Sequence, residues 1–126
     1  MENLIINSTD ETPQVSLDME SGLLEFSGKS LPEDVSTFYG PVLSWIDGYI
    51  RSPKTKTEVS FKLSYFNTAS SKLILDILFK FESFHQSGND VVIKWYHQED
   101  DEDMEEAGNE YSGLVLIPFE VHTIAE

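Results

Sequence analysis

The sequence contains no cysteine and few basic residues, and these two shortages exclude several classes of protein. Without cysteine there is no disulfide framework, no thiolate nucleophile and no cysteine-based zinc site, which fits a reducing compartment. Only 8 lysines and arginines stand against 23 aspartates and glutamates, for a formal net charge of -15. DNA, RNA and anionic membranes would repel such a chain, because nucleic-acid affinity depends on neutralising phosphates. We therefore expect neither a nucleic acid nor a membrane as partner. Proteins with basic surfaces remain possible partners.

Long hydrophobic runs and an N-terminal signal sequence are missing too. No stretch approaches the length needed to span a bilayer, and the first residues, MENLIINSTDETP, contain no basic segment followed by an apolar one. We expect a cytoplasmic protein. The 126 residues, of which 40% are hydrophobic and 12% aromatic, have the size and apolar content of a single globular domain covering residues 1–126.

Motifs for common catalytic and cofactor sites are also absent. The three histidines are far apart, and there is no nucleophile elbow, phosphate-binding glycine loop or dinucleotide fingerprint. The acidic run at residues 99–106, EDDEDMEE, lacks the alternating oxygen ligands and central glycine of a calcium loop, and charge runs usually form a solvated face. We expect no catalytic residue, no metal and no cofactor.

Hydrophobic periodicity predicts strands and helices in the order β-β-β-α-β-α-β-α-β. The strands are expected at residues 3–7, 14–18, 23–27, 59–65, 90–97 and 114–124. The helices are expected from about residue 32 to 51, from 70 to about 85, and from the acidic run to about 111. Pro41 lies inside the first helical pattern, which predicts either a kink or a helix that properly starts at this proline.

The order of elements predicts an α/β fold with an open mixed sheet. The second and third strands form an N-terminal β-hairpin, and the later strand–helix–strand units imply parallel neighbours joined by right-handed crossovers. In the strand at residues 59–65, one face carries Val59, Phe61, Leu63 and Tyr65, and the other face is polar. Because only one face is apolar, we expect about three helices mainly on that face of the sheet.

The most informative stretch joins the strand at residues 59–65 to the following helix. It contains Asn67, Thr68, Ser70 and Ser71, small residues that suit the capping of free N–H groups at a helix start. In one hypothesis the hydroxyls of this stretch only cap the helix. In the other, an accessible hydroxyl is a phosphorylation switch, because a helix start tolerates an anion while a docked partner would meet new bulk and charge.

Several motifs make the chain similar to the SiaC-type regulatory phosphoproteins, a bacterial family with a fold like the STAS domains of anti-sigma-factor antagonists. The motifs are TP at 12–13, GKSLPE at 28–33, FYGP at 38–41 with Trp45, YFNTASSK at 65–72, DIL at 76–78, VIKWY at 92–96 and PF at 118–119. The resemblance spans nearly the whole chain and is densest at residues 65–72.

The resemblance implies a STAS-like fold and a regulatory function without enzymatic activity. In that family a cognate serine/threonine kinase phosphorylates the threonine of the Asn-Thr pair, and a metal-dependent protein phosphatase removes the phosphate. The unphosphorylated form binds and activates a diguanylate cyclase, and so acts in cyclic-di-GMP signalling. The matching phosphoacceptor here is Thr68, with Ser70 and Ser71 as secondary candidates. Partner contacts are expected at Asn67, Thr68, Ser70, Ser71 and Lys72.

Two residues depart from the family pattern. Ala69 stands where a serine is expected and Ser71 where an apolar residue is expected, which bears on the specificity of the kinase.

Two other functions remain open. One alternative is a STAS-like module that binds a small ligand or lipid between the helices. The other is an enzyme that uses the carboxylates at residues 99–106.

Overall fold

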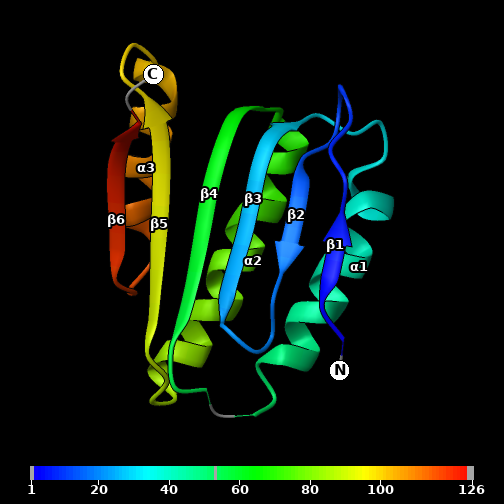
Figure 1. The fold of residues 1–126 in the computed structure, drawn as a ribbon. Coiled ribbons are helices and arrows are strands. Elements are labelled where there is room, and N and C mark those ends of the chain that lie inside the picture. The colour runs from blue at the N-terminus through cyan, green and yellow to red at the C-terminus, as the bar shows by residue number, and fades with distance from the viewer. Residues whose placement is uncertain (1, 53, 125–126) are drawn as a thin grey trace.

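The computed structural model describes residues 2–52 and 54–124. Its elements are β1 (Leu4–Ile6), β2 (Gln14–Leu17), β3 (Leu23–Ser30), α1 (Val35–Tyr49), β4 (Thr57–Phe66), α2 (Thr68–Gln86), β5 (Val91–Gln98), α3 (Glu102–Leu114) and β6 (Phe119–Ile124). Figure 1 shows the helices lying behind one face of the sheet. The predicted order and type of the elements are confirmed.

The six strands form one mixed sheet in which spatial order follows chain order, β1-β2-β3-β4-β5-β6. The pairs β1–β2 and β2–β3 are antiparallel, whereas β3–β4, β4–β5 and β5–β6 are parallel. Each parallel pair is joined by a crossover helix, so α1, α2 and α3 all start near the carboxyl ends of strands. The predicted STAS-like open mixed sheet, with its N-terminal hairpin, is confirmed.

The hydrophobic core lies between the sheet and its helices. Phe26 of β3 stacks on Phe61 of β4 with ring centroids 5.0 Å apart, and Phe61 packs against Trp95 of β5 at 5.4 Å. All three rings are at most 2% exposed. Burial of such large apolar rings is strongly favourable and helps to hold the helices on this face.

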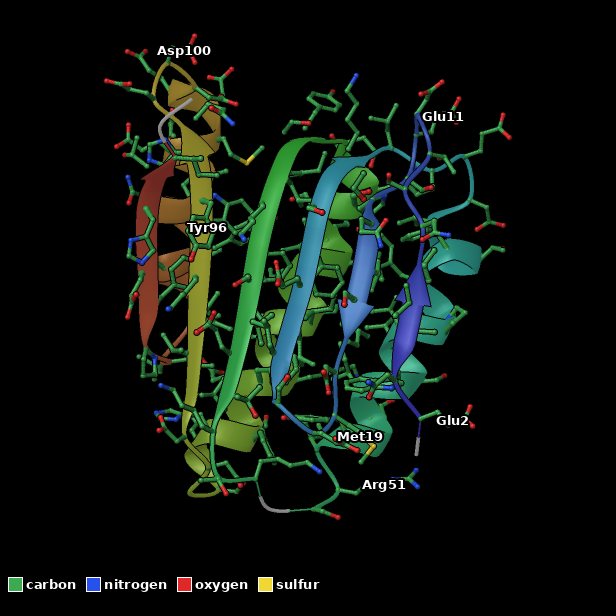
Figure 2. All side chains as sticks on the ribbon, viewed as in Figure 1. Glu2, Glu11, Met19, Arg51, Tyr96 and Asp100 are labelled. Carbon is green, nitrogen blue, oxygen red and sulfur yellow. The ribbon has the colours of Figure 1, made fainter. Side chains whose placement is uncertain are left out.

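The opposite face of the sheet is polar, and its charged side chains pair across the strands. Lys62 lies 3.3 Å from Glu25, and Lys94 lies 3.1 Å from Glu58. Tyr96, labelled in Figure 2, is on this face, and the Lys62 amino group is 5.1 Å from the centre of its ring. Alternation along the strands therefore leaves one face solvated, as the sequence predicts.

A β-bulge near the end of β4 changes this alternation. The β3–β4 register shifts so that Gly28 pairs with Leu63 and Lys29 with Tyr65. Tyr65 is consequently turned outwards and is 55% exposed, while Phe66 is partly buried. The prediction that Tyr65 shares the buried face with Leu63 is wrong, because one extra residue resets which side chains face the core.

The strands β4 and β5 diverge towards their carboxyl ends. They pair only from Thr57 with Val91 to Phe61 with Trp95, although β4 continues to Phe66 and β5 continues to Gln98. Aromatic rings of Phe66, Trp95 and Tyr111 bridge this divergence, with centroids 5.3 to 6.3 Å apart. Tyr111 comes from α3, so this helix is attached to the sheet at the point where the two strands separate (Figure 1).

The helix α1 begins before its proline. Asp34 is the N-cap, and its side chain accepts a hydrogen bond from the Thr37 N–H at 3.2 Å. Hydrogen bonding by the Thr37 side chain, together with this backbone bond, lowers the pKa of the Asp34 carboxyl below its usual value. Pro41 lies inside α1 and is exposed, so the hypothesis of a helix starting at Pro41 is wrong. The missing N–H of Pro41 leaves the Thr37 carbonyl without its helical donor.

The last strand is shorter than the prediction of residues 114–124. The helix α3 extends to Leu114, and β6 begins only at Phe119. Val115 and Ile117 are buried in the intervening loop, which explains why their pattern resembles a strand: periodicity reports burial, not hydrogen bonding. Pro118 directly precedes β6, an edge strand, where the missing N–H costs little.

In the described part of the chain, no helix combines the length and the apolar character that a membrane crossing requires.

Candidate functional site

The turn between β4 and α2 is built around Asn67. Its side-chain oxygen accepts a hydrogen bond from the Ser70 N–H at 2.8 Å, and its carbonyl accepts one from the Ser71 N–H at 3.0 Å. Its own N–H donates to the Ser30 carbonyl at 3.0 Å, which ties the turn to the end of β3. Asn67 is therefore the N-cap, and the hypothesis that the hydroxyls cap the helix is wrong.

Ser70 lies beneath the turn and is fully buried, at 0% exposure. Its hydroxyl donates to the Ser30 carbonyl at 2.9 Å and accepts from the Ser30 hydroxyl at 2.8 Å. The Ser30 hydroxyl in turn lies 2.5 Å from the Tyr39 hydroxyl of α1. Burial raises the pKa of Tyr39, so this network stays uncharged at neutral pH. A kinase or partner has no access to Ser70 in the folded protein, which argues against the expected role of Ser70 at the surface.

Ser71 links α2 to α3. The hydroxyl of Tyr111 lies 3.0 Å from the Ser71 carbonyl oxygen and 3.1 Å from its hydroxyl oxygen. Burial raises the pKa of Tyr111, so the phenol remains a hydrogen-bond donor at neutral pH. Ser71 is half-buried, and its hydroxyl is already engaged in holding the two helices together.

Thr68 is the first residue of α2 and is exposed, as are Ala69 and Lys72. The first amide groups of a helix have no partner within the helix, and together they carry about half a positive charge. The first turn of α2 contains no acidic residue, so no side-chain carboxylate there offsets the partial positive charge at the start of the helix. The structure thus brings Asn67, Thr68, Ser71 and Lys72 together at the surface and leaves Ser70 inside.

The acidic run forms the beginning of α3. Asp101 is the N-cap, accepting a hydrogen bond from the Met104 N–H at 3.0 Å, and Glu102, Asp103 and Glu105 occupy the first turn. Negative charge at a helix start is favourable, which gives this run a structural role. Within residues 2–52 and 54–124, no three or more acidic or histidine side chains are grouped closely enough to hold a metal ion.

Sequence reasoning did not identify the residues of a second part of this region, between α2 and α3. A hollow there is lined by Phe66, Ser71, Leu75, Ala107, Glu110, Tyr111 and Leu114. The available signal was that Leu75 and Phe79 lie outside the buried stripe of α2, which comprises Ser70, Ile74, Ile77, Leu78, Phe81 and Phe84. Phe79 is 42% exposed. A contiguous exposed apolar patch, unlike a single exposed residue, can mark a contact surface.

A mixed sheet with crossover helices on one face, and an exposed capped turn at the end of a central strand, defines an α/β protein of the STAS-like type. Residues 6–124 match the family described as SiaC family regulatory phosphoprotein, and the chain belongs to that family. A regulatory phosphoprotein acts through its partners, so the predicted family and the predicted lack of enzymatic activity are both confirmed.

Individual relatives agree with the family assignment. An uncharacterised protein of Pseudomonas aeruginosa (strain UCBPP-PA14) is 31% identical over 121 residues, which cover 96% of both chains. The solved structure of SiaC of Pseudomonas aeruginosa is similar with a TM-score of 0.90 and 29% identity, covering 98% of this chain and 100% of SiaC. A second SiaC structure matches with a TM-score of 0.92 and 30% identity, covering 96% of this chain and 99% of SiaC. In that structure SiaC of Pseudomonas aeruginosa is the activator in complex with the diguanylate cyclase SiaD.

Proposed function

We propose that this chain activates a diguanylate cyclase by direct binding, and that phosphorylation of Thr68 switches the binding off. The similarity to SiaC, an activator in complex with a cyclase, supports the choice of partner. The choice of Thr68 as the phosphoacceptor is based on the different environments of the hydroxyl groups in the turn. Thr68 is exposed at the start of α2, whereas Ser70 is buried and Ser71 is hydrogen-bonded to Tyr111.

A phosphate on Thr68 is compatible with the fold. It would add a charge of about -1.5 to -2 beside free amide groups and the positive end of the helix dipole. The first turn of α2 contains no acidic side chain that would repel the phosphate. Phosphorylation therefore changes the surface of the folded protein without unfolding it.

The same phosphate would disrupt a partner docked over Asn67, Thr68, Ser71 and Lys72. Docking would require the charged phosphate to lose its water, which is costly unless the partner supplies matching hydrogen bonds. A cognate serine/threonine kinase adds the phosphate and a metal-dependent protein phosphatase removes it. Because the kinase consumes ATP, the cycle operates in the cytoplasm and adjusts cyclic-di-GMP synthesis.

Replacement of Thr68 tests the switch. Thr68→Ala should bind and activate the cyclase like the unmodified chain, whereas Thr68→Glu should bind at least about ten-fold more weakly. The measurement is a binding titration, with product formation, against purified SiaD of Pseudomonas aeruginosa and against the cyclase of the source organism. Ser36→Glu is the control, because it places the same charge in the first turn of α1. Equal binding by Thr68→Ala and Thr68→Glu would refute the switch.

Mapping of the phosphate provides a direct test. The chain is incubated with its cognate kinase and ATP, and the modified peptide is identified by mass spectrometry. Phosphate on Thr68 supports the proposal. Phosphate on Ser70, Ser71 or another residue, with Thr68 unmodified, would show that the switch is located elsewhere.

A further inference from the structure

A row of buried hydroxyl groups connects helix α1 to the turn that contains Thr68. Tyr39 of α1, Ser30 of β3 and Ser70 of α2 are each at most 1% exposed. The Tyr39 hydroxyl lies 2.5 Å from the Ser30 hydroxyl, which lies 2.8 Å from the Ser70 hydroxyl. The three residues belong to three different sequence motifs, GKSLPE, FYGP and YFNTASSK. Segments that are far apart in the chain therefore meet beneath the candidate phosphoacceptor.

The hydrogen bonds of this row run in one direction. Each hydroxyl has a single hydrogen to donate. Ser70 donates to the Ser30 carbonyl, and Ser30 donates to the Ser70 hydroxyl. The remaining bond, between Tyr39 and Ser30, therefore uses the Tyr39 hydrogen. Burial raises the pKa of Tyr39, so the phenol keeps this hydrogen at neutral pH. Tyr39 is thus the first donor of the row, and the Ser30 carbonyl is its last acceptor.

Ser30 connects the row to the backbone of the turn. Its carbonyl accepts hydrogen bonds from the Asn67 N–H at 3.0 Å and from the Ser70 hydroxyl at 2.9 Å. The Asn67 side chain in turn accepts the Ser70 N–H at 2.8 Å, which completes the N-cap of α2. Thr68 is exposed, so the position of its hydroxyl depends on the backbone on either side of it. That backbone is held from within by Ser30 and Ser70.

We propose that Tyr39 and Ser30 are positioning residues for the phosphorylation switch. Both are buried, so they act through the turn and do not touch the phosphate or a partner. Their hydroxyl groups hold the turn in one conformation, which is bound both by the kinase and by the cyclase. The proposal rests on the proposed function and adds the residues that determine how Thr68 is presented.

Loss of the Tyr39 hydroxyl should weaken both interactions by the same factor. Without this donor the Ser30 hydroxyl loses a partner, and the turn populates conformations that present Thr68 differently. Each partner then binds only the fraction of molecules in the competent conformation, so its apparent affinity falls in proportion to that fraction. The net contribution of an ordinary hydrogen bond corresponds to a factor of about 2 to 10.

Tyr39→Phe and Tyr49→Phe form a matched pair for the test. Tyr49 also belongs to α1 and is 1% exposed, and its hydroxyl lies 2.8 Å from the Thr57 hydroxyl. Thr57 begins β4, so this second bond is roughly 30 Å from the turn at about 3.3 Å per residue. Each variant loses one buried phenol hydroxyl and one hydrogen bond. We expect both replacements to lower Tm by similar amounts.

The two variants are compared well below their Tm for phosphorylation by the cognate kinase and for binding to a cyclase. The cyclases are purified SiaD of Pseudomonas aeruginosa and the cyclase of the source organism. Tyr39→Phe should raise the KM of the kinase reaction and the Kd of the cyclase by the same factor, about 2 to 10, with kcat unchanged. Tyr49→Phe should match the unmodified chain. Equal effects of the two replacements, or a change in only one of the two interactions, would overturn the proposal.

Amide hydrogen exchange tests the positioning without any partner. The Asn67 N–H should exchange faster in Tyr39→Phe and in Ser30→Ala than in Tyr49→Phe, after correction for global stability. Unchanged protection of Asn67 would overturn the proposal. If the unmodified chain is not phosphorylated on Thr68 and binds neither cyclase, the proposed function fails. If it is phosphorylated and binds, and Tyr39→Phe behaves like Tyr49→Phe, only this inference fails.

Discussion

Two hydroxyl groups of the same helical turn lie in opposite environments. Thr68 is exposed at the start of α2, while Ser70 is at 0% exposure and exchanges hydrogen bonds with Ser30. A negative charge at these two positions should therefore have very different consequences for stability. This contrast supports the proposal that Thr68 is the phosphoacceptor.

Acidic substitutions at the two positions measure the difference. Thr68→Glu should change the free energy of unfolding by less than about 1 kcal/mol, because its charge is solvated and faces the helix dipole. Ser70→Asp should cost on the order of 3 kcal/mol or more, because it buries a charge that has no cationic partner. Urea unfolding of the two variants and of Ser70→Ala provides the comparison. A similar loss of stability in Thr68→Glu and Ser70→Asp would contradict the difference in burial between Thr68 and Ser70.

At the scale of elements, the attachment of α3 depends on a close approach between helix and sheet. The Trp95 indole N–H donates to the Met104 carbonyl at 2.9 Å, and the ring is at 0% exposure. A Cβ atom added to Gly108 would lie only 2.4 Å from the Trp95 ring. The absence of a side chain at Gly108 thus allows α3 to rest on the aromatic cluster and to form one wall of the hollow between α2 and α3.

Glycine replacements within α3 test this packing. Gly108→Ala should lower the free energy of unfolding by about 1 to 2 kcal/mol, since overpacking exceeds the roughly 1 kcal/mol gained in helix propensity. Gly113→Ala in the same helix is the control, because a Cβ there would meet nothing within 4 Å. That variant should be unchanged or slightly more stable. Urea unfolding followed by tryptophan fluorescence distinguishes the two; a stabilised Gly108→Ala would show that α3 can shift without cost.

At the scale of the whole molecule, acidic residues far outnumber basic ones, with 23 aspartates and glutamates against 8 lysines and arginines. Figure 2 labels acidic residues at both ends of the molecule, Glu2 at one end and Glu11 and Asp100 at the other. The Lys–Glu pairs on the open face, formed by Lys62 and Lys94, are partly exposed and contribute little stability each. The net charge of -15 is the excess of acidic over basic residues, so no ion pair within the chain can balance it, and its self-repulsion opposes the folded state.

Salt should consequently stabilise the protein at neutral pH. Raising NaCl from about 10 mM to about 100 mM shortens the Debye length from about 30 Å to about 10 Å, which screens the repulsion. Tm should rise by a few degrees at pH 7. The effect should largely disappear near pH 4.3, the sequence isoelectric point, where the net charge approaches zero. A Tm that falls with salt at pH 7 would mean that favourable ion pairs outweigh the repulsion.

Much of the fold could be predicted because local patterns and chain order point to the same answer. The switch from alternating to helical periodicity after β4 located both elements and the turn between them. The predictions that failed concern the buried face of Tyr65, the alternative that a helix starts at Pro41, and the start of β6. Each depends on an event that periodicity does not contain: a register shift opposite Gly28, a helix that continues through a proline, and a buried loop.

The sequence by itself determined the α/β order, the absence of cysteine chemistry, the strongly negative charge and the capped turn at Asn67. Which hydroxyl of that turn faces solvent was decided only by the tertiary structure, because burial of Ser70 requires Ser30 from β3 and Tyr39 from α1. The hollow between α2 and α3 likewise depends on tertiary structure, since β4 and β5 diverge there and α3 rests on Trp95. Local patterns report which side of an element is apolar; the surface that two distant elements form together depends on their packing.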